Sequence, residues 1–237
     1  MIHIATVHWN TDKWIGIQQS YLRMHIKSPY RVYAWLTNIP PAMSDSFYYS
    51  CSEPVNSHPI QLNILAEIIY FASNRDDDIL IFLDGDAFPI RDVESFIKDK
   101  LSCYKLMAVQ RLKNNGDIQP HPCFCATTVG FWKSRKGDWK GGCEWRNKDD
   151  KRTTDVGGNL LKQLRESGVD WYPLLRSNKR NLHPVFFAAY DRVIYHHGAG
   201  FRDVLTRLDL GNSKTGFSEG EDSGPLAAYC TRSTWTT

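Results

Sequence analysis

One segment constrains the fold of this sequence more than any other, a run of five apolar residues that leads directly into two aspartates. The run covers residues 79–83, and Asp84-Gly85-Asp86 follow it. An uninterrupted apolar run of this length is typical of a central strand in a parallel sheet, because helices cover both of its faces. In such sheets, ligands bind at the carboxyl ends of the strands. We therefore predict a buried strand with a ligand site at its end.

The two aspartates themselves indicate the kind of ligand. Asp84 and Asp86 are two residues apart, so their side chains share one side of an extended chain, and Gly85 lets the backbone come close to a ligand. Two carboxylates suit a hard divalent cation, Mn²⁺ or Mg²⁺, which binds substrate phosphates as well. A plain Asp-Gly turn is the alternative, although a turn needs neither the second aspartate nor the apolar run.

The remaining periodicity predicts an α/β fold. Residues 2–8, 31–36, 79–84, 105–110 and 193–196 have strand patterns, whereas 11–24, 61–73, 93–101 and 159–167 have helical spacing. The order β-α-β-α-β favours a mixed, mostly parallel central sheet with helices on both faces. Residues 123–132 are rich in β-formers and follow no helix, so we expect them to form a strand that pairs in the opposite direction.

Composition limits the number of domains and the kinds of partner. The chain has 237 residues, and we expect one domain over 1–210 followed by a polar, flexible tail over 211–237. A net charge of +3 is too small to indicate a nucleic-acid-binding protein. The segment 133–152 is more basic, with eight Lys or Arg against four Asp or Glu. It is either a surface for an anionic acceptor or an ordinary solvated loop.

The cysteines and the apolar segments indicate the compartment. Six cysteines are present, but the chain is larger than disulfide-stapled scaffolds and starts without a leader pattern, so we expect free thiols and a cytoplasmic location. Cys123 and Cys125 lie near His121 but lack zinc-site spacing, so we expect buried thiols on a strand. No apolar run is long enough to span a bilayer, and any membrane contact is expected to be peripheral.

Four segments together resemble a known family. They are Asp84-Gly85-Asp86, residues 127–130, residues 154–159, and the sequence His-His-Gly-Ala-Gly-Phe-Arg at 196–202. In this combination the chain resembles nucleotide-sugar-dependent glycosyltransferases of the GT-A fold. The resemblance implies a donor linked to UDP or GDP, an Mn²⁺ or Mg²⁺ ion, and a glycan or glycoconjugate acceptor, as in polysaccharide biosynthesis.

The resemblance also implies roles for residues around the metal. Asp86 would bind the ion, and Asp84 would contact the ion or the donor ribose. His197, three residues before Gly200, fits the family's His-x-x-Gly pattern, with His196 as the competing ligand. Arg202 stands where the family often has a lysine that contacts phosphate, but the Pro and Trp that usually follow are missing.

Other roles concern the reacting groups and the nucleotide base. By resemblance, Asp155 would be the general base that takes the proton of the acceptor hydroxyl, although it could instead stabilise the start of the helix at 159–167. His8 and Trp9 would lie at the base, with Trp9 stacked on it or buried in the core. Arg111 would reach the donor or the acceptor, or would simply be an exposed arginine. The stereochemistry of transfer stays open.

Two other functions compete with glycosyl transfer. A haloacid-dehalogenase-like phosphohydrolase also places two aspartates after an apolar strand. Those enzymes usually have Gly and then Thr or Val after the second aspartate, whereas Ala87-Phe88-Pro89 stand here. A non-catalytic sugar-binding module would account for the 13% aromatic content, but it would not need a metal and diphosphate site.

Overall fold

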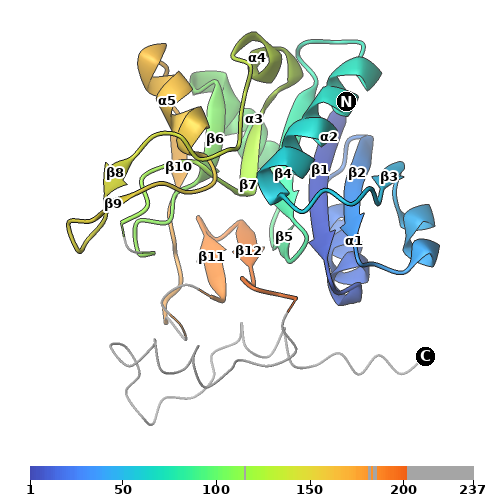
Figure 1. The fold of residues 1–237 in the computed structure, drawn as a ribbon. Helices are drawn as coiled ribbons and strands as arrows, with labels where there is room; N and C mark the ends of the chain where they lie inside the picture. The colour runs from blue at the N-terminus through green and yellow to red at the C-terminus, as the bar shows by residue number, and fades with distance from the viewer. Residues whose placement is uncertain (115, 181–182, 184–185, 202–237) are drawn as a thin grey trace.

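The computed structural model describes residues 1–114, 116–180, 183 and 186–201, and Figure 1 shows the arrangement of their helices and strands. The strands are β1 (Ile2–Trp9), β2 (Tyr30–Thr37), β3 (Tyr49–Cys51), β4 (Ile79–Asp84), β5 (Ala87–Pro89), β6 (Leu106–Val109), β7 (His121–Thr128), β8 (Trp145–Arg146), β9 (Arg152–Thr153), β10 (Tyr172–Leu174), β11 (Ala188–Tyr190) and β12 (Ile194–His196). The helices are α1 (Lys13–His25), α2 (His58–Ala72), α3 (Val93–Cys103), α4 (Val129–Ser134) and α5 (Gly158–Glu166), with a 3-10 turn, η1, at Pro41–Ser46.

A seven-stranded sheet forms the centre of the molecule, in the order β10-β6-β7-β4-β1-β2-β3. Neighbouring strands are parallel except where β7 pairs with β4 and β6, because β7 runs the other way. The predicted mixed, mostly parallel sheet is confirmed. The β4 strand lies between β1 and β7 and is the central strand that its apolar run predicts.

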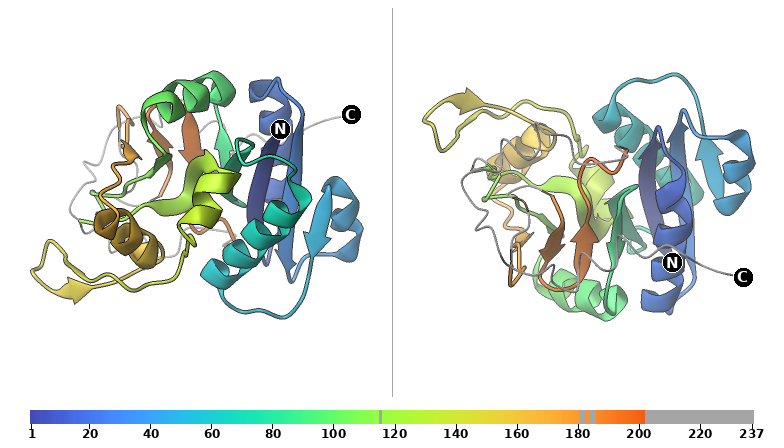
Figure 2. Two further views of the ribbon diagram at one scale, coloured as in Figure 1. Left: turned by 90° about the horizontal axis from the view of Figure 1, so that it is seen from above. Right: turned by 90° about the horizontal axis from the view of Figure 1, so that it is seen from below.

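Helices cover both faces of this sheet. Side chains of α1 and α3 pack with Ile81 and Leu83 of β4 on one face, while α2, α4 and α5 pack with Leu80 and Phe82 on the other. Figure 2 shows the sheet between these two groups of helices. Both faces of β4 are therefore buried, which is why its sequence has no polar alternation.

Several expectations about individual elements need correction. The β-rich stretch 123–132 forms an antiparallel strand only as far as Thr128, which then caps α4 by accepting a hydrogen bond from the Phe131 amide at 3.2 Å. In α1, Met24 ends the helical spacing seen over 11–24 but is 51% exposed, and the buried face carries Leu22 instead. Short strands such as β3 and β5 have too few residues to show a period in the sequence.

A second, three-stranded sheet in the order β11-β12-β5 lies beside the central sheet. β12 pairs antiparallel with β5, and His196 is opposite Ala87 in this register. β5 starts directly after Asp86, so this pairing brings the end of β12 to the end of β4. The sequence predicts β12 as a strand but not this sheet.

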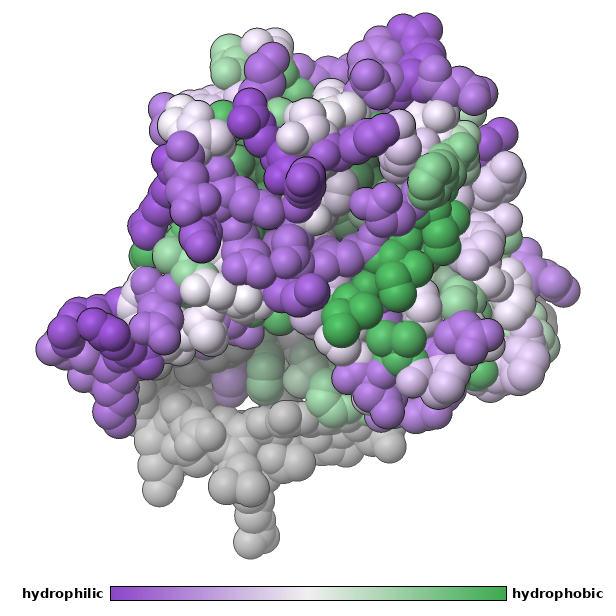
Figure 3. All heavy atoms as spheres, turned by 45° about the horizontal axis from the view of Figure 1, so that its top comes forward, coloured by the Kyte–Doolittle hydropathy of each residue, from purple (hydrophilic) through white to green (hydrophobic). Residues whose placement is uncertain are grey.

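On the face of the molecule that Figure 3 shows, an apolar band follows α2. Ile60, Ile64 and Phe71 of this helix are exposed, and Phe71 is 80% exposed. Among the described residues, no helix combines the length and apolar character that a bilayer crossing requires. The five described cysteines are free thiols, with Cys123 and Cys125 buried in β7 as expected.

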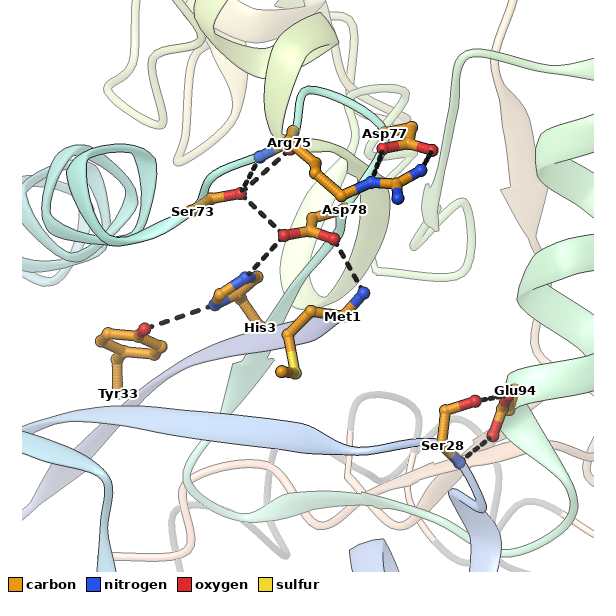
Figure 4. A network of polar contacts seen from close by, with 9 residues as sticks. All are labelled: Met1, His3, Ser28, Tyr33, Ser73, Arg75, Asp77, Asp78 and Glu94. Atoms are coloured by element: carbon orange, nitrogen blue, oxygen red, sulfur yellow. Dashed lines mark hydrogen bonds and ion pairs between the residues drawn. The ribbon is translucent and has the colours of Figure 1, made fainter.

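Two buried carboxylates join elements at the edge of the sheet opposite the carboxyl ends of β1 and β4 (Figure 4). Asp78 accepts a hydrogen bond from Ser73 at 2.8 Å and contacts His3 at 3.3 Å. Glu94, in the first turn of α3, accepts from the backbone amides of Lys27 and Ser28 at 2.7 and 2.8 Å. Glu94 therefore connects α3 to the loop between α1 and β2.

We expect Glu94→Gln to lower the free energy of unfolding at pH 7 by about 1–3 kcal/mol, as for hydrogen bonds to a charged group. The Lys98 side chain and the hydrogen bonds from Ser28 and Lys27 outweigh the effect of burial and lower the pKa of Glu94 to about 2. The contribution is therefore complete above pH 4.5 and lost as the pH falls toward about 2. Urea unfolding across this range should show the wild type and variant converging at acid pH. Asp99→Asn, an exposed change on the same helix, is the control, and a gap that persists at pH 2 would contradict the assignment.

Candidate functional site

A cavity of about 640 Å³ opens at the carboxyl ends of β1 and β4. Its walls include the end of β1, the turn between β4 and β5, the start of α2, the end of β12 and residues 198–201. This is the edge at which parallel sheets bind ligands. His8, Trp9, Asp84, Asp86, Arg111 and His196, which the sequence analysis singled out, all line it.

Three of these residues form a cluster suited to a cation. One ligand atom from each of Asp84, Asp86 and His196 lies within 4.8 Å of the other two. The His196 Nε2 is 3.5 Å from Asp84 Oδ2 and 3.3 Å from Asp86 Oδ1. Ligands side by side around an ion with bonds of about 2.1 Å would be about 3 Å apart, so the cluster needs little movement to enclose one.

Buried hydrogen bonds hold the aspartate turn in place. Gln18 of α1 is fully buried, and its Nε2 donates to the carbonyls of Asp84 and Ala87, each at 2.9 Å. On the other side, the amide of Gly200 donates to Asp86 Oδ2 at 2.9 Å, and its carbonyl accepts from Trp14 Nε1 at 2.8 Å. A Cβ at Gly200 would lie 2.6 Å from that of Asp86, so only glycine allows this approach.

The structure gives Gly85 a role besides the expected one. The sequence suggested a glycine that lets the backbone approach a ligand, and Gly85 does line the cavity. In addition, its amide donates to the carbonyl of Val7 at 3.0 Å, and an added Cβ would lie 2.6 Å from that oxygen and 2.7 Å from Nδ1 of His8. Gly85 is required because β1 packs against the turn at this point.

Charge in the cluster is balanced by His196. Burial alone would raise the pKa of Asp86, but His196 and the Gly200 amide hold it at about 2. Burial likewise opposes a charge on His196, yet Cys123 and Asp86 raise its pKa well above the usual value. A protonated His196 thus supplies the positive charge that two largely enclosed carboxylates require, which is the charge that a metal ion would otherwise supply.

Of the two adjacent histidines, the structure places His196 in the cluster rather than His197. The register of β12 against β5 turns His196 toward the aspartates. The His197 ring packs on Trp14 at 4.5 Å between ring centroids, and its Nδ1 is 3.3 Å from the Tyr195 hydroxyl. Burial lowers the pKa of His197 to about 4.

His8 and Trp9 lie at the end of β1, as expected for residues beside a nucleotide base. Trp9 is partly exposed to the cavity. His8 is buried, and burial lowers its pKa to about 4, so the ring is neutral at neutral pH. Its Nε2 has no hydrogen-bond partner among the described residues, and a ligand in the cavity would supply one.

Arg111 and Asp155 form an ion pair at the rim of the cavity. Arg111 Nη2 donates to Asp155 Oδ2 and to Asp117 Oδ2, each at 3.1 Å. The other oxygen of Asp155 accepts from the Val156 amide at 2.8 Å. The Arg111 side chain is only 14% exposed, so the alternative of an exposed arginine is wrong. Asp155 does not cap α5, because Gly157 is the N-cap.

The sequence singled out neither His58 nor His121 as a residue of this site, and it drew attention to His121 only as a neighbour of Cys123 and Cys125. His58, at the start of α2, lies 3.1 Å from Asp84. His121 lines the cavity, its Nδ1 accepts from the Cys123 amide at 3.1 Å, and burial lowers its pKa well below the usual value. Its Nε2 therefore carries the proton and can donate to a ligand. Neither histidine belongs to a local motif.

Arg202 and the tail 211–237, for which the sequence also made predictions, lie outside the described residues.

No protein-family model matches the sequence, and no curated protein matches it. Several solved structures of glycosyltransferases have a similar arrangement. The galactosyltransferase LgtC, in complex with donor and acceptor sugar analogues, has a TM-score of 0.44 and 11% identity over 72% of this chain and 73% of its own. GlyE of Streptococcus pneumoniae TIGR4 has a TM-score of 0.43 and 10% identity over 73% of this chain and 45% of its own. S. aureus TarS 1–349 in complex with UDP-GlcNAc has a TM-score of 0.41 and 10% identity over 76% of this chain and 60% of its own. Identity at this level concerns the fold alone.

Proposed function

We propose that this protein is a metal-dependent glycosyltransferase, which moves a sugar from a UDP- or GDP-linked donor to a hydroxyl of a glycan or glycoconjugate. The observation that carries the proposal is the cluster of Asp84, Asp86 and His196 in a cavity of about 640 Å³ at the carboxyl end of the sheet. A cavity of this size accommodates a small organic ligand such as a nucleotide sugar.

Asp84, Asp86 and His196 fit Mn²⁺ or Mg²⁺, which take carboxylate oxygens and share their coordination with phosphates, and the imidazole favours Mn²⁺. When bound, such an ion neutralises the negative charge that develops on the departing nucleoside diphosphate. The residues of the chain set where this happens. Gln18 and Gly200 hold the aspartates rigidly, so that both carboxylates face the cavity.

Two groups of residues at the cavity suit the two substrates. Trp9 and His8 provide an aromatic surface and an unpartnered nitrogen for the base of the donor. Arg111 and His121 provide hydrogen-bonding groups on the cavity wall, and Asp155 is held beside them by its ion pair with Arg111. Asp155 is the candidate general base for the acceptor hydroxyl, with Arg111 fixing one of its oxygens.

We expect the protein to bind Mn²⁺ weakly alone and about tenfold or more tightly with UDP or GDP, because two carboxylates and one imidazole leave coordination positions for phosphate oxygens. Titration calorimetry with Mn²⁺, each nucleotide, and both together measures this. Equal Mn²⁺ affinity with and without nucleotide would contradict a diphosphate site.

A panel of UDP- and GDP-sugars, assayed for nucleoside diphosphate release with and without Mn²⁺, then identifies the donor. Release that depends on Mn²⁺ supports glycosyl transfer. Cleavage of a phosphomonoester in the absence of any such release would support the phosphohydrolase alternative instead.

A further inference from the structure

His58 contacts one oxygen of a proposed metal ligand, while the other oxygen of that ligand faces the cluster. The His58 Nε2 lies 3.1 Å from Oδ1 of Asp84. Oδ2 of the same carboxylate lies 3.5 Å from Nε2 of His196. The Asp84 side chain therefore lies between two imidazoles, one on each oxygen.

The start of α2 is fixed, which places His58 where this contact can form. Gln61, three residues further along the helix, is fully buried, and its Nε2 donates to Thr37 Oγ1 at 3.0 Å and to the Val55 carbonyl at 2.5 Å. Thr37 is the last residue of β2, so α2 begins beside the carboxyl edge of the sheet. The His58 side chain is 33% exposed and can turn within this fixed frame.

Oδ1 of Asp84 needs the donor that His58 offers. This oxygen is buried and makes no well-directed hydrogen bond with any described residue. His58 Nε2 is within hydrogen-bond distance but off the ideal direction, and a rotation of the ring would aim its N–H at the oxygen. A buried carboxylate oxygen without a donor is costly, so this rotation is favourable.

His58 itself lies outside the cluster of potential ligand atoms. The atoms within 4.8 Å of one another come from Asp84, Asp86 and His196. This geometry indicates that His58 contacts a metal-binding residue and does not bind the metal itself. Outer partners of this kind fix the orientation of metal-binding carboxylates, and their removal usually costs 10- to 100-fold in metal affinity.

We propose that His58 is a positioning residue, which holds Oδ1 of Asp84 so that Oδ2 is presented to the divalent ion. The inference rests on the proposed function, because it concerns the same metal site. It predicts that a side chain able to donate one N–H at this position will substitute for the histidine, whereas an apolar one will not.

The test measures Mn²⁺ binding, without nucleotide or activity, by titration calorimetry. His58→Ala should bind Mn²⁺ about 10- to 100-fold more weakly than the wild type, and His58→Gln should recover most of the loss. In an Asp84→Asn background, His58→Ala should have little further effect, because the residue acts through Asp84. His25→Gln, a histidine at the end of α1, is the matched control.

Pulsed EPR of bound Mn²⁺ separates positioning from direct coordination. A positioning residue predicts the same nitrogen coupling, from one imidazole, in the wild type and in His58→Gln. A second nitrogen coupling that disappears in His58→Gln would overturn the proposal, as would unchanged Mn²⁺ affinity in both variants. A wild type that binds no Mn²⁺ with or without nucleotide would overturn the proposed function as well, so the two failures are distinguishable.

Discussion

Asp86→Asn should lose both Mn²⁺-dependent nucleotide binding and turnover, each by roughly 100-fold or more, because a direct metal ligand contributes more than the outer partners of such sites. The substitution keeps the shape of the side chain and an oxygen for the Gly200 amide, but it removes the charge. Asp86→Ala is a less clear test, since it would also remove the oxygens that contact His196 and the Gly200 amide.

Calorimetry with Mn²⁺ and UDP or GDP, together with donor turnover, measures the effect of Asp86→Asn. Thermal unfolding establishes that the variant is folded. Asp45→Asn, an exposed carboxylate in η1, is the control and should behave as wild type. Normal nucleotide binding and transfer by Asp86→Asn would mean that Asp84-Gly85-Asp86 is a plain turn, which is the alternative to a metal site.

Asp155→Asn should lower turnover by about 100-fold or more while donor binding changes little, because the variant lacks the base that accepts the acceptor proton. The amide keeps an oxygen for the Val156 N–H. The substitution weakens the ion pair with Arg111, but 46% of the Asp155 side chain is exposed to solvent. We therefore expect the free energy of unfolding to change by only about 0–1 kcal/mol.

Asp117→Asn is the matched variant for Asp155, because Asp117 is the other carboxylate on Arg111 but is buried away from solvent. Turnover and melting temperature are measured on the same preparations of both variants. A fall in turnover that is confined to Asp155→Asn supports the base. An equal fall in both would mean that the carboxylates act by orienting Arg111, and unchanged turnover in Asp155→Asn would remove Asp155 from the reaction.

The sequence by itself determined the helices and strands that are long enough to show a pattern of apolar residues. The run before Asp84 predicted β4 correctly because a strand buried on both faces must be apolar throughout. Leu62, Leu65 and Ile69 likewise predicted α2, since a helix needs its apolar residues on one side. β5, with three residues, was missed because a segment of this length has no period to detect.

The sequence also indicated a site at Asp84 and Asp86, but it could not complete the set of residues around them. The choice between His196 and His197 depends on a shift of one residue, which turns a side chain to the other face of a strand. Only the pairing of β12 with β5 decides it. His58 and His121 come to the cavity from distant elements, and Gly85 proved to serve the packing of β1. Local patterns determined the strand and its two carboxylates, whereas contacts between segments that are separated in the sequence, which leave no local pattern, decided their partners.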